Sequence, residues 1–212
     1  MTTIIDGTSG VTFPAGGVGN PAGAVVGTTD TQTLTNKTLT SPTISGAVVS
    51  SMNSSVITSN TAVASTSGTS IDFTSIPSWV KRITVMFNGI SKSSTANFRV
   101  RLGTGGSPTT TGYTTAANIV TTAASACVSS AAGFDTTGDA IATATVSGNL
   151  VFVNLSGNIW TCSSVLHTPT PTVGNIFIAG IVTLSGTLDM VRITTTSGTD
   201  TFDAGSINIL YE

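Results

Sequence analysis

The sequence predicts an all-β protein in which an extended N-terminal arm and a short stalk precede a jelly-roll-like antiparallel β-sandwich, with three chains forming a trimer. Short runs of alternating apolar and polar residues recur from about residue 65 onward, and glycine, asparagine and serine divide them. A helical period is confined to residues 115–126. Many short strands at such close spacing are typical of sandwiches and related all-β folds.

Charged residues are scarce, and this scarcity favours association between chains. Only 8% of the 212 residues are charged, and serine and threonine together make up about a third. Threonine favours strands, and its hydroxyl group keeps an outer face polar. With so little charge, exposed strand edges are open to edge-to-edge pairing, a route to aggregation. We therefore expect a homo-oligomer in which the chains bury each other's edges.

Residues 1–28 are predicted to form the N-terminal arm. Glycine and proline occur there at a density that excludes a helix and interrupts any strand after a few residues. The apolar residues of the arm have no local core to enter, so we expect them to dock on a partner; they include Ile4, Ile5, Val11 and Phe13.

Residues 29–60 are predicted to form the stalk. Two similar five-residue units rich in threonine follow one another, and Leu34, Leu39 and Ile44 recur every five residues. One apolar residue in five cannot be buried within a single chain. Three parallel chains would bring the three copies of each residue together on a common axis, with the threonines outside. The alternative is a flexible linker rich in serine and threonine.

Residues 61–212 are predicted to form the sandwich. The expected strands are 70–73, 82–88, 97–102, 140–146, 149–155, 158–165, 175–184, 188–195 and 206–211. A Gly-Asn pair opens three of these runs, at residues 148, 157 and 174, and such pairs favour chain reversal. The stretch 103–112 is expected to be a long loop at one end of the sandwich, where binding specificity commonly resides.

The residues that carry chemistry predict neither an enzyme nor a metal or cofactor site. His167 is the only histidine, and no nucleophile signature surrounds it. Cys127 and Cys162 do not form a close-spaced pair of metal ligands, and they are expected to be reduced because residues 1–10 lack the features of a secretory signal. The remote alternative is a polysaccharide-cleaving activity, with four candidate carboxylates: Asp135, Asp139, Asp200 and Asp203.

Charge also limits the classes of partner. A formal net charge of −2 with only 7 Lys and Arg disfavours nucleic-acid binding, and no apolar run approaches the roughly 20 residues of a membrane helix. Four cations fall on two predicted strands that we expect to be neighbours: Lys81, Arg82, Arg99 and Arg101. We expect them to form a solvated strand face. The alternative is that they bind an acidic glycan or a carboxylate of a neighbouring chain.

Three segments resemble proteins of tailed bacteriophages. The stretch Thr-Thr-Asp-Thr-Gln-Thr-Leu-Thr-Asn-Lys-Thr-Leu-Thr-Ser-Pro at residues 28–42 is similar to a segment that recurs in phage fibre and structural proteins. Residues 70–87, with Ile-Pro-Ser-Trp-Val-Lys-Arg at their centre, and the final residues 202–212 are similar to the C-terminal domain of phage tail-fibre or virion structural proteins.

This resemblance implies a homotrimer in the virion, assembled in the cytoplasm of the host bacterium. The arm would anchor on other virion proteins, in the capsid or in the tail and baseplate, and the C-terminal β-domain would point outward and contact a host-surface glycan. The family has no catalytic residues to transfer. The alternative function is a capsid decoration protein or head fibre that docks on the phage shell through the same arm.

Overall fold

The computed structural model describes residues 4–6, 10–12, 57–169 and 173–212, and the chain divides into two compact units, Met1–Ser51 and Met52–Glu212. In the first unit, β1 (Ile4–Asp6) pairs antiparallel with β2 (Gly10–Thr12), and the backbone places Ile5 opposite Val11. Four of the residues expected to anchor or trimerise the chain lie outside the described residues: Phe13, Leu34, Leu39 and Ile44.

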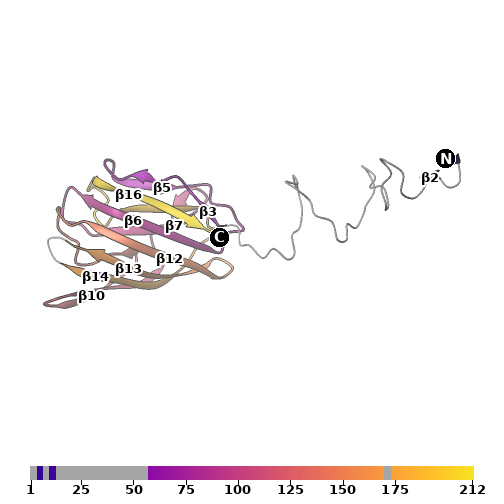
Figure 1. Cartoon of the computed structure of the whole chain (residues 1–212). Coiled ribbons are helices and arrows are strands. Elements are labelled where there is room, and N and C mark those ends of the chain that lie inside the picture. Colours follow the sequence, from indigo (N-terminus) through magenta and orange to yellow (C-terminus); the bar gives the residue numbers. More distant parts are fainter. Residues whose placement is uncertain (1–3, 7–9, 13–56, 170–172) are drawn as a thin grey trace. The chain divides into compact units, whose positions relative to one another are not determined.

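The described part of the second unit is all β, as predicted, and holds no helix (Figure 1). Its strands are β3 (Thr58–Ser59), β4 (Val63–Ala64), β5 (Ser70–Phe73), β6 (Arg82–Lys92), β7 (Phe98–Thr104), β8 (Ser107–Pro108), β9 (Tyr113–Thr121), β10 (Ser125–Ser130), β11 (Phe134–Asp135), β12 (Val146–Ser156), β13 (Ile159–Thr168), β14 (Gly174–Thr183), β15 (Met190–Thr195) and β16 (Phe202–Tyr211).

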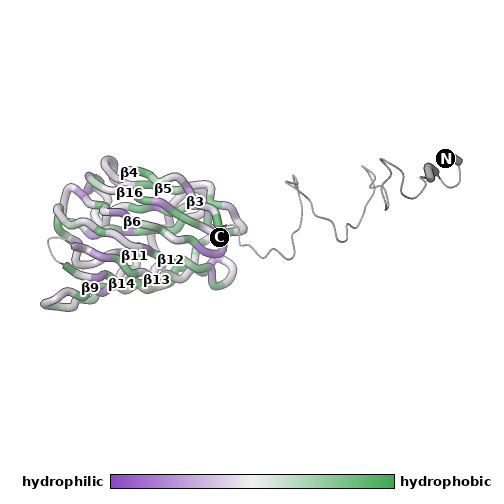
Figure 2. The backbone as a smooth tube through the Cα atoms, in the orientation of Figure 1, coloured by the Kyte–Doolittle hydropathy of each residue, from purple (hydrophilic) through white to green (hydrophobic). Residues whose placement is uncertain are grey.

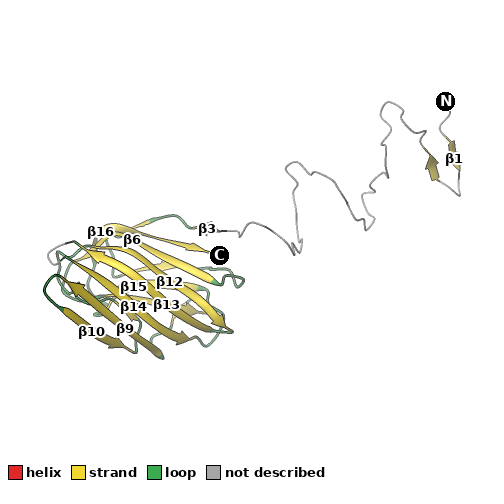
Figure 3. Cartoon of the chain, turned by 60° about the horizontal axis from the view of Figure 1, so that its bottom comes forward, coloured by secondary structure: helices red, strands yellow, loops and turns green. Residues whose placement is uncertain are grey.

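These strands form two sheets in which every described pairing is antiparallel. The nine-stranded sheet has the order β10-β9-β14-β13-β12-β6-β16-β3, and β4 also pairs with β16. The five-stranded sheet has the order β11-β7-β15-β5, and β8 pairs with β7. Figure 3 shows β10 and β9 at one side of the larger sheet and β6 and β16 toward the other.

The two sheets pack face to face around one apolar core, a sandwich-like arrangement. Phe98 of β7 stacks on Phe202 of β16 with 5.9 Å between ring centroids, and Phe134 of β11 meets Phe152 of β12 at 5.1 Å. Such aromatic pairs stabilise a core beyond the area they bury. Each contact joins a strand of one sheet to a strand of the other. Figure 2 shows the hydrophobic segments recurring along the strands of both sheets.

Alternation explains why these segments are strands. In β6, Ile83, Val85 and Phe87 are buried while the intervening residues are more exposed, as the sequence predicted.

Trp160 of β13 is buried in the core. Trp79 is half exposed and packs against Tyr211 of β16, with 5.9 Å between the ring centroids.

The helical interpretation of residues 115–126 is wrong. The segment belongs to a hairpin of β9 and β10, in which Ala117 and Ile119 point into the core and Cys127 lies opposite Asn118. Alanine gave this stretch its helical appearance, but cross-strand packing outweighs intrinsic propensity. The expected strand at 140–146 is also wrong, because β12 begins only at Val146.

The turn predictions have mixed outcomes. Gly157 has a φ of 51° and makes the hairpin turn between β12 and β13, whereas Gly148, with a φ of 129°, lies at an irregularity within β12. A side chain at Gly148 would lie 2.5 Å from the carbonyl oxygen of Val165. The expected loop at 103–112 is partly ordered as a hairpin, since β8 folds back on β7 through Gly105 and Gly106.

Candidate functional site

Three arginines gather on the outer face of the five-stranded sheet. The core-facing side chains of β7 are Phe98, Val100 and Leu102, so Arg99 and Arg101 point outward from the same strand. On the neighbouring β15, Arg192 lies directly opposite Arg101, and Thr194 lies opposite Arg99. Strand pairing therefore brings three guanidinium groups and one hydroxyl group into a single cluster, which we call the arginine pocket.

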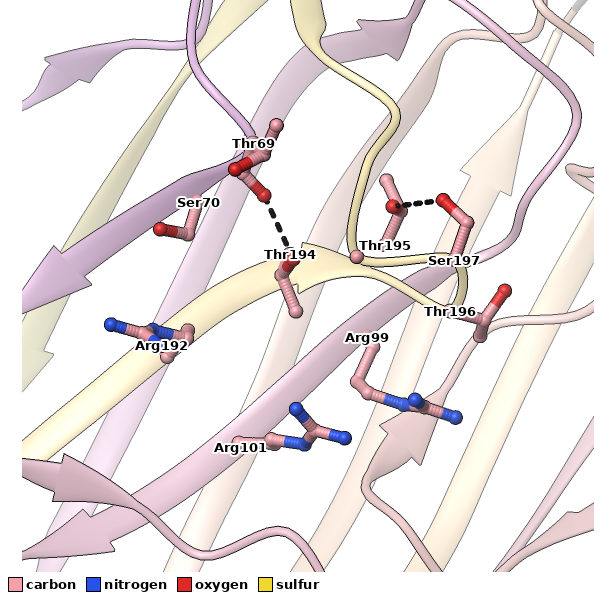
Figure 4. A pocket seen from close by; sticks show the side chains of 10 residues that line it. Thr69, Ser70, Arg99, Arg101, Arg192, Thr194, Thr195, Thr196 and Ser197 are labelled. Carbon is pink, nitrogen blue, oxygen red and sulfur yellow. Dashed lines mark hydrogen bonds between the residues drawn. The ribbon is translucent and has the colours of Figure 1, made fainter.

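The arginine pocket is a hollow of about 290 Å³ whose walls are otherwise polar. Figure 4 shows Arg192 to one side of Thr194 and Arg99 to the other, with Arg101 near both. The remaining lining residues carry hydroxyl groups or no side chain, and they come from the start of β5, from β15 and from the turn that follows it: Thr69, Ser70, Thr195, Thr196, Ser197 and Gly198.

Two of the three arginines are paired with carboxylates. Arg99 donates from Nε and from one terminal nitrogen to the two oxygens of Asp135, at 2.6 and 2.7 Å. Arg192 forms the same two-point contact with Asp72, at 2.7 and 2.6 Å. Both contacts are bidentate, the geometry that makes arginine–carboxylate pairs strong and well oriented.

Arg101 differs from the other two arginines. Its Nε donates to the carbonyl oxygen of Ala132 at 2.8 Å, and within the described ranges its guanidinium has no carboxylate partner. Burial, and then repulsion from Arg99, lowers the pKa of Arg101. The hydrogen bonds to Asp72 raise the pKa of Arg192. Arg101 is therefore the cation of the pocket whose charge is least compensated.

The prediction that four cations share one region is wrong. Arg82 lies on β6, in the other sheet, and its terminal nitrogen contacts Glu212 at 2.9 Å. Lys81 precedes β6, and its Nζ lies 3.4 Å from Oδ1 of Asn154. Arg192 was not among the cations that the sequence pattern grouped together. Its place in the alternating segment 188–195 is visible in the sequence, but its pairing with β7 depends on contacts between distant segments.

The four candidate carboxylates are each held by neighbouring groups. Asp135 is held by Arg99, and Asp139 is buried with Lys92, its Oδ2 3.3 Å from Nζ. Asp200 accepts from the backbone N–H of Ala96 at 3.0 Å and from Ser197, and Asp203 accepts from the hydroxyl of Ser91. The contacts that each carboxylate makes join two segments of the chain, which is a structural role. In the described ranges, no three His, Cys, Asp or Glu side chains lie close enough to hold a metal.

The remaining residues that sequence analysis considered lie apart from the arginine pocket. His167 on β13 contacts the carbonyl oxygen of Gly174 through Nδ1 at 3.1 Å. Both cysteines are free thiols: Cys162 is buried, and burial raises its pKa, whereas Cys127 is exposed on β10. No helix among the described residues has the length and hydropathy to cross a membrane.

A second surface of interest lies on the larger sheet. The strands β10, β9, β14, β13 and β12 are neighbours, and none of these five contains Asp, Glu, Lys or Arg. We call the outward side of these strands the uncharged face. Its apolar side chains are well exposed, with Val165 at 59% and Phe177 at 42%.

The uncharged face carries a ridge and a hollow. Val165 lies opposite Phe177, which lies opposite Asn118, so a ridge crosses three strands. Beside it is a hollow of about 330 Å³, lined mostly by small or apolar residues that include Ala116, Ala179 and Cys127. Such a surface is typical of protein–protein contacts.

These two surfaces, one cationic and one uncharged, are the functional candidates that the described residues present. Comparisons of the chain with protein-family models, with curated proteins and with solved structures find no match.

Proposed function

We propose that this chain is a structural, non-enzymatic protein of a tailed-phage virion. Three copies form a fibre or spike, the N-terminal arm anchors it, and the C-terminal β-unit points outward to contact the host surface. The virion setting rests on the resemblance of residues 28–42, 70–87 and 202–212 to phage proteins, and the single structural observation that supports association of the chains is the uncharged face. It is a broad surface that a protein partner would cover, on a chain with very little charge to keep it apart from its own copies.

A second copy of the same chain is the partner that best fits the uncharged face. Because the five strands carry no Asp, Glu, Lys or Arg, three copies packed around a common axis would bring no charged side chain of this face into their contacts. The side chains of β10 are exposed along most of the strand, and the strand lies at the end of the sheet. Edge strands of monomers are commonly protected by charge or proline, and β10 has neither.

The finer features of the proposal follow the sequence. The trimer would continue into the stalk, where Leu34, Leu39 and Ile44 would meet on the common axis. The arm would present Ile4, Ile5, Val11 and Phe13 to another virion protein. Within the β-unit we propose a jelly-roll-like arrangement of the two sheets. It is supported by repeated crossing of the chain between the sheets, at β4–β5, β5–β6, β6–β7, β8–β9, β10–β11, β11–β12, β14–β15 and β15–β16.

Light scattering of the full chain tests the oligomeric part of the proposal. We expect three times the 21.2 kDa mass of one chain. A double variant, Val165→Asp with Phe177→Asp, places two carboxylates directly opposite each other on the uncharged face, and we expect it to weaken or abolish the assembly. The control is Thr110→Asp, an exposed position in the loop after β8. A monomeric wild-type chain would overturn the trimer.

Immunogold electron microscopy of intact virions, with antibody raised against the full chain, tests the location. Label at the tail or baseplate is expected for a host-contacting fibre. Label scattered over the head would replace this assignment with the capsid decoration or head-fibre role. Virions without label would contradict both.

A further inference from the structure

We propose that the arginine pocket binds the carboxylate of an acidic sugar residue within a polysaccharide. The proposal names the ligand class of the proposed host contact. Its biological setting rests on the proposed function. The binding chemistry rests on the geometry of the pocket.

The charges in the arginine pocket do not balance. Three guanidinium groups meet two carboxylates, and each carboxylate uses both of its oxygens on one arginine. Asp135 and Asp72 are thereby committed to Arg99 and Arg192. One positive charge remains, on Arg101, directly opposite Arg192 and two residues from Arg99 on its own strand. A bound anion would offset this repulsion between neighbouring cations.

The position of Arg101 leaves it ready to bind. Its Nε donates a hydrogen bond to the carbonyl oxygen of Ala132, and this bond fixes the orientation of the side chain. Neither terminal nitrogen has a hydrogen-bond partner among the described residues. The terminal groups of a guanidinium suit a planar carboxylate, whose two oxygens can accept two parallel hydrogen bonds. Fixing the side chain in advance reduces the entropy lost when a ligand binds.

The walls of the pocket suit the remainder of a sugar. The hydroxyl groups of Ser70 and Thr196 make no hydrogen bond within the described ranges and are available to sugar hydroxyls. By contrast, Thr194 already donates to the carbonyl of Thr69 at 2.8 Å. The volume of about 290 Å³ lies near the lower end of small-molecule sites, which start at roughly 300 Å³, and suits one sugar residue.

The surroundings favour a single charged group over a continuous polyanion. The chain has a net charge of −2, and the other described arginine, Arg82, belongs to the opposite sheet. A phosphate backbone needs a row of cations, which this surface does not offer. A polysaccharide with one carboxylate per repeat places one anion in each pocket, and three pockets on a trimer would raise the overall avidity.

Isothermal titration calorimetry of the full chain tests the site. The probes are trigalacturonate as a carboxylated sugar, a glycerol-phosphate oligomer as a phosphate source and maltotriose as a neutral sugar. We expect trigalacturonate alone to bind, and to bind less tightly as salt rises. Arg101→Gln should weaken binding at least about tenfold, the scale of losing one charge-assisted hydrogen bond. Arg101→Lys should weaken binding less than Arg101→Gln, because lysine keeps the positive charge but lacks the planar guanidinium that makes two parallel hydrogen bonds.

Two further variants distinguish a loss of binding from a loss of folding. Arg82→Gln removes an arginine of the other sheet and should leave binding unchanged. Ser70→Asp places a carboxylate at the exposed start of β5, in the pocket wall, and should weaken binding without removing any contact of Arg101. Circular dichroism and light scattering of the same samples report the fold and the oligomeric mass.

Several results would overturn the proposal. They are binding of the phosphate oligomer as tight as that of trigalacturonate, equal loss in Arg82→Gln and Arg101→Gln, or no binding of any probe. None of them would alter the mass or virion label that test the proposed function, so failure of the ligand assignment and failure of the virion role are distinguishable.

Discussion

Lys92 and Asp139 form an ion pair that is fully shielded from solvent, with 3.3 Å between Nζ and Oδ2. Lys92 ends β6 of the larger sheet, while Asp139 lies in the segment between β11 and β12. The same ammonium group contacts the backbone carbonyl of Asp139 and lies 4.2 Å from the ring centroid of Phe98 on β7. The carboxylate also accepts from the backbone N–H of Phe98 at 3.2 Å. One buried pair thus ties both sheets to a long connection.

Replacing Asp139 by asparagine should destabilise the β-unit strongly, because it leaves the ammonium of Lys92 buried without a counter-charge. Loss of one partner of a buried pair costs about 3–5 kcal/mol of unfolding free energy. Urea denaturation of the full chain, at several protein concentrations, measures this loss. The matched control is Asp72→Asn, which breaks the more exposed pair with Arg192 and should cost clearly less, on the order of 1 kcal/mol. Equal losses would contradict the structural role of the buried pair.

Gly205→Ala should be much more damaging than Gly157→Ala. Both glycines have positive φ, 90° and 51°, so each alanine strains the backbone. At Gly205, within the irregular part of β16, the new Cβ would also lie 2.5 Å from the carbonyl oxygen of Gly89, whereas at Gly157 it would meet nothing within 4 Å. We expect thermal unfolding to show a small decrease in the midpoint temperature for Gly157→Ala and a several-fold larger decrease for Gly205→Ala. Similar decreases would contradict the close approach of β16 and β6.

The stability of the β-unit should fall at alkaline pH, partly through Tyr113. Burial raises the pKa of Tyr113 to about 12 from its ordinary value of 10.0, so the folded state favours the neutral phenol. That contribution to stability is fully present below about pH 10 and is lost as the pH rises toward about 12. Urea titrations at pH 8, 10 and 11 should show a steeper decline for the wild type than for Tyr113→Phe.

At neutral pH, the same substitution should cost about 1–2 kcal/mol. The phenol oxygen of Tyr113 accepts a hydrogen bond from the backbone N–H of Leu102 at 3.1 Å. Its hydroxyl group donates toward the carbonyl oxygens of Leu102, at 3.2 Å, and Thr109, at 3.1 Å. Parallel pH profiles for the two proteins would contradict the titration of Tyr113, while leaving its hydrogen bonds intact as an explanation of the neutral-pH loss.

Cys127 should report whether the uncharged face is covered. Its side chain is exposed on β10 within one chain and lines the apolar hollow of that face, whereas Cys162 is buried. In the proposed trimer we expect slow alkylation of Cys127. The double variant Val165→Asp with Phe177→Asp should accelerate the reaction several-fold, and mass spectrometry of peptides assigns the site. Fast alkylation in a wild-type oligomer would place the contact between copies elsewhere.

The alternating segments allowed the sequence to predict much of the fold. Ile83, Val85 and Phe87 face the core in β6, as their period of two requires. The failures occur where local pattern and long-range packing disagree. The alanines of 115–126 suit a helix in isolation, but Ala117 is buried opposite Ile178 of β14, a contact that no local pattern encodes.

The candidate site was predicted only in part, for a related reason. Arg99 and Arg101 could be assigned to one strand face from their spacing alone. Arg192 joins them only because β15 pairs with β7 across a long stretch of sequence, and Arg82 leaves the group because β6 enters the other sheet. Strand order in a sandwich is set by the whole core, so the partners of an arginine on a strand cannot be inferred from its neighbours in sequence.

The position of β6 has a consequence for biosynthesis. β6 lies between β12 and β16, so its first neighbour begins at Val146 and its second at Phe202. Until β12 has emerged from the ribosome, both hydrogen-bonding edges of β6 lack their native partners, and the edge that pairs with β16 lacks its partner until the last strand has emerged. Non-local pairing of this kind slows folding and exposes sticky edges on the nascent chain. We therefore expect the β-unit to fold only after β16 has emerged from the ribosome, and its yield in cells to depend on chaperones that shield β6 until then.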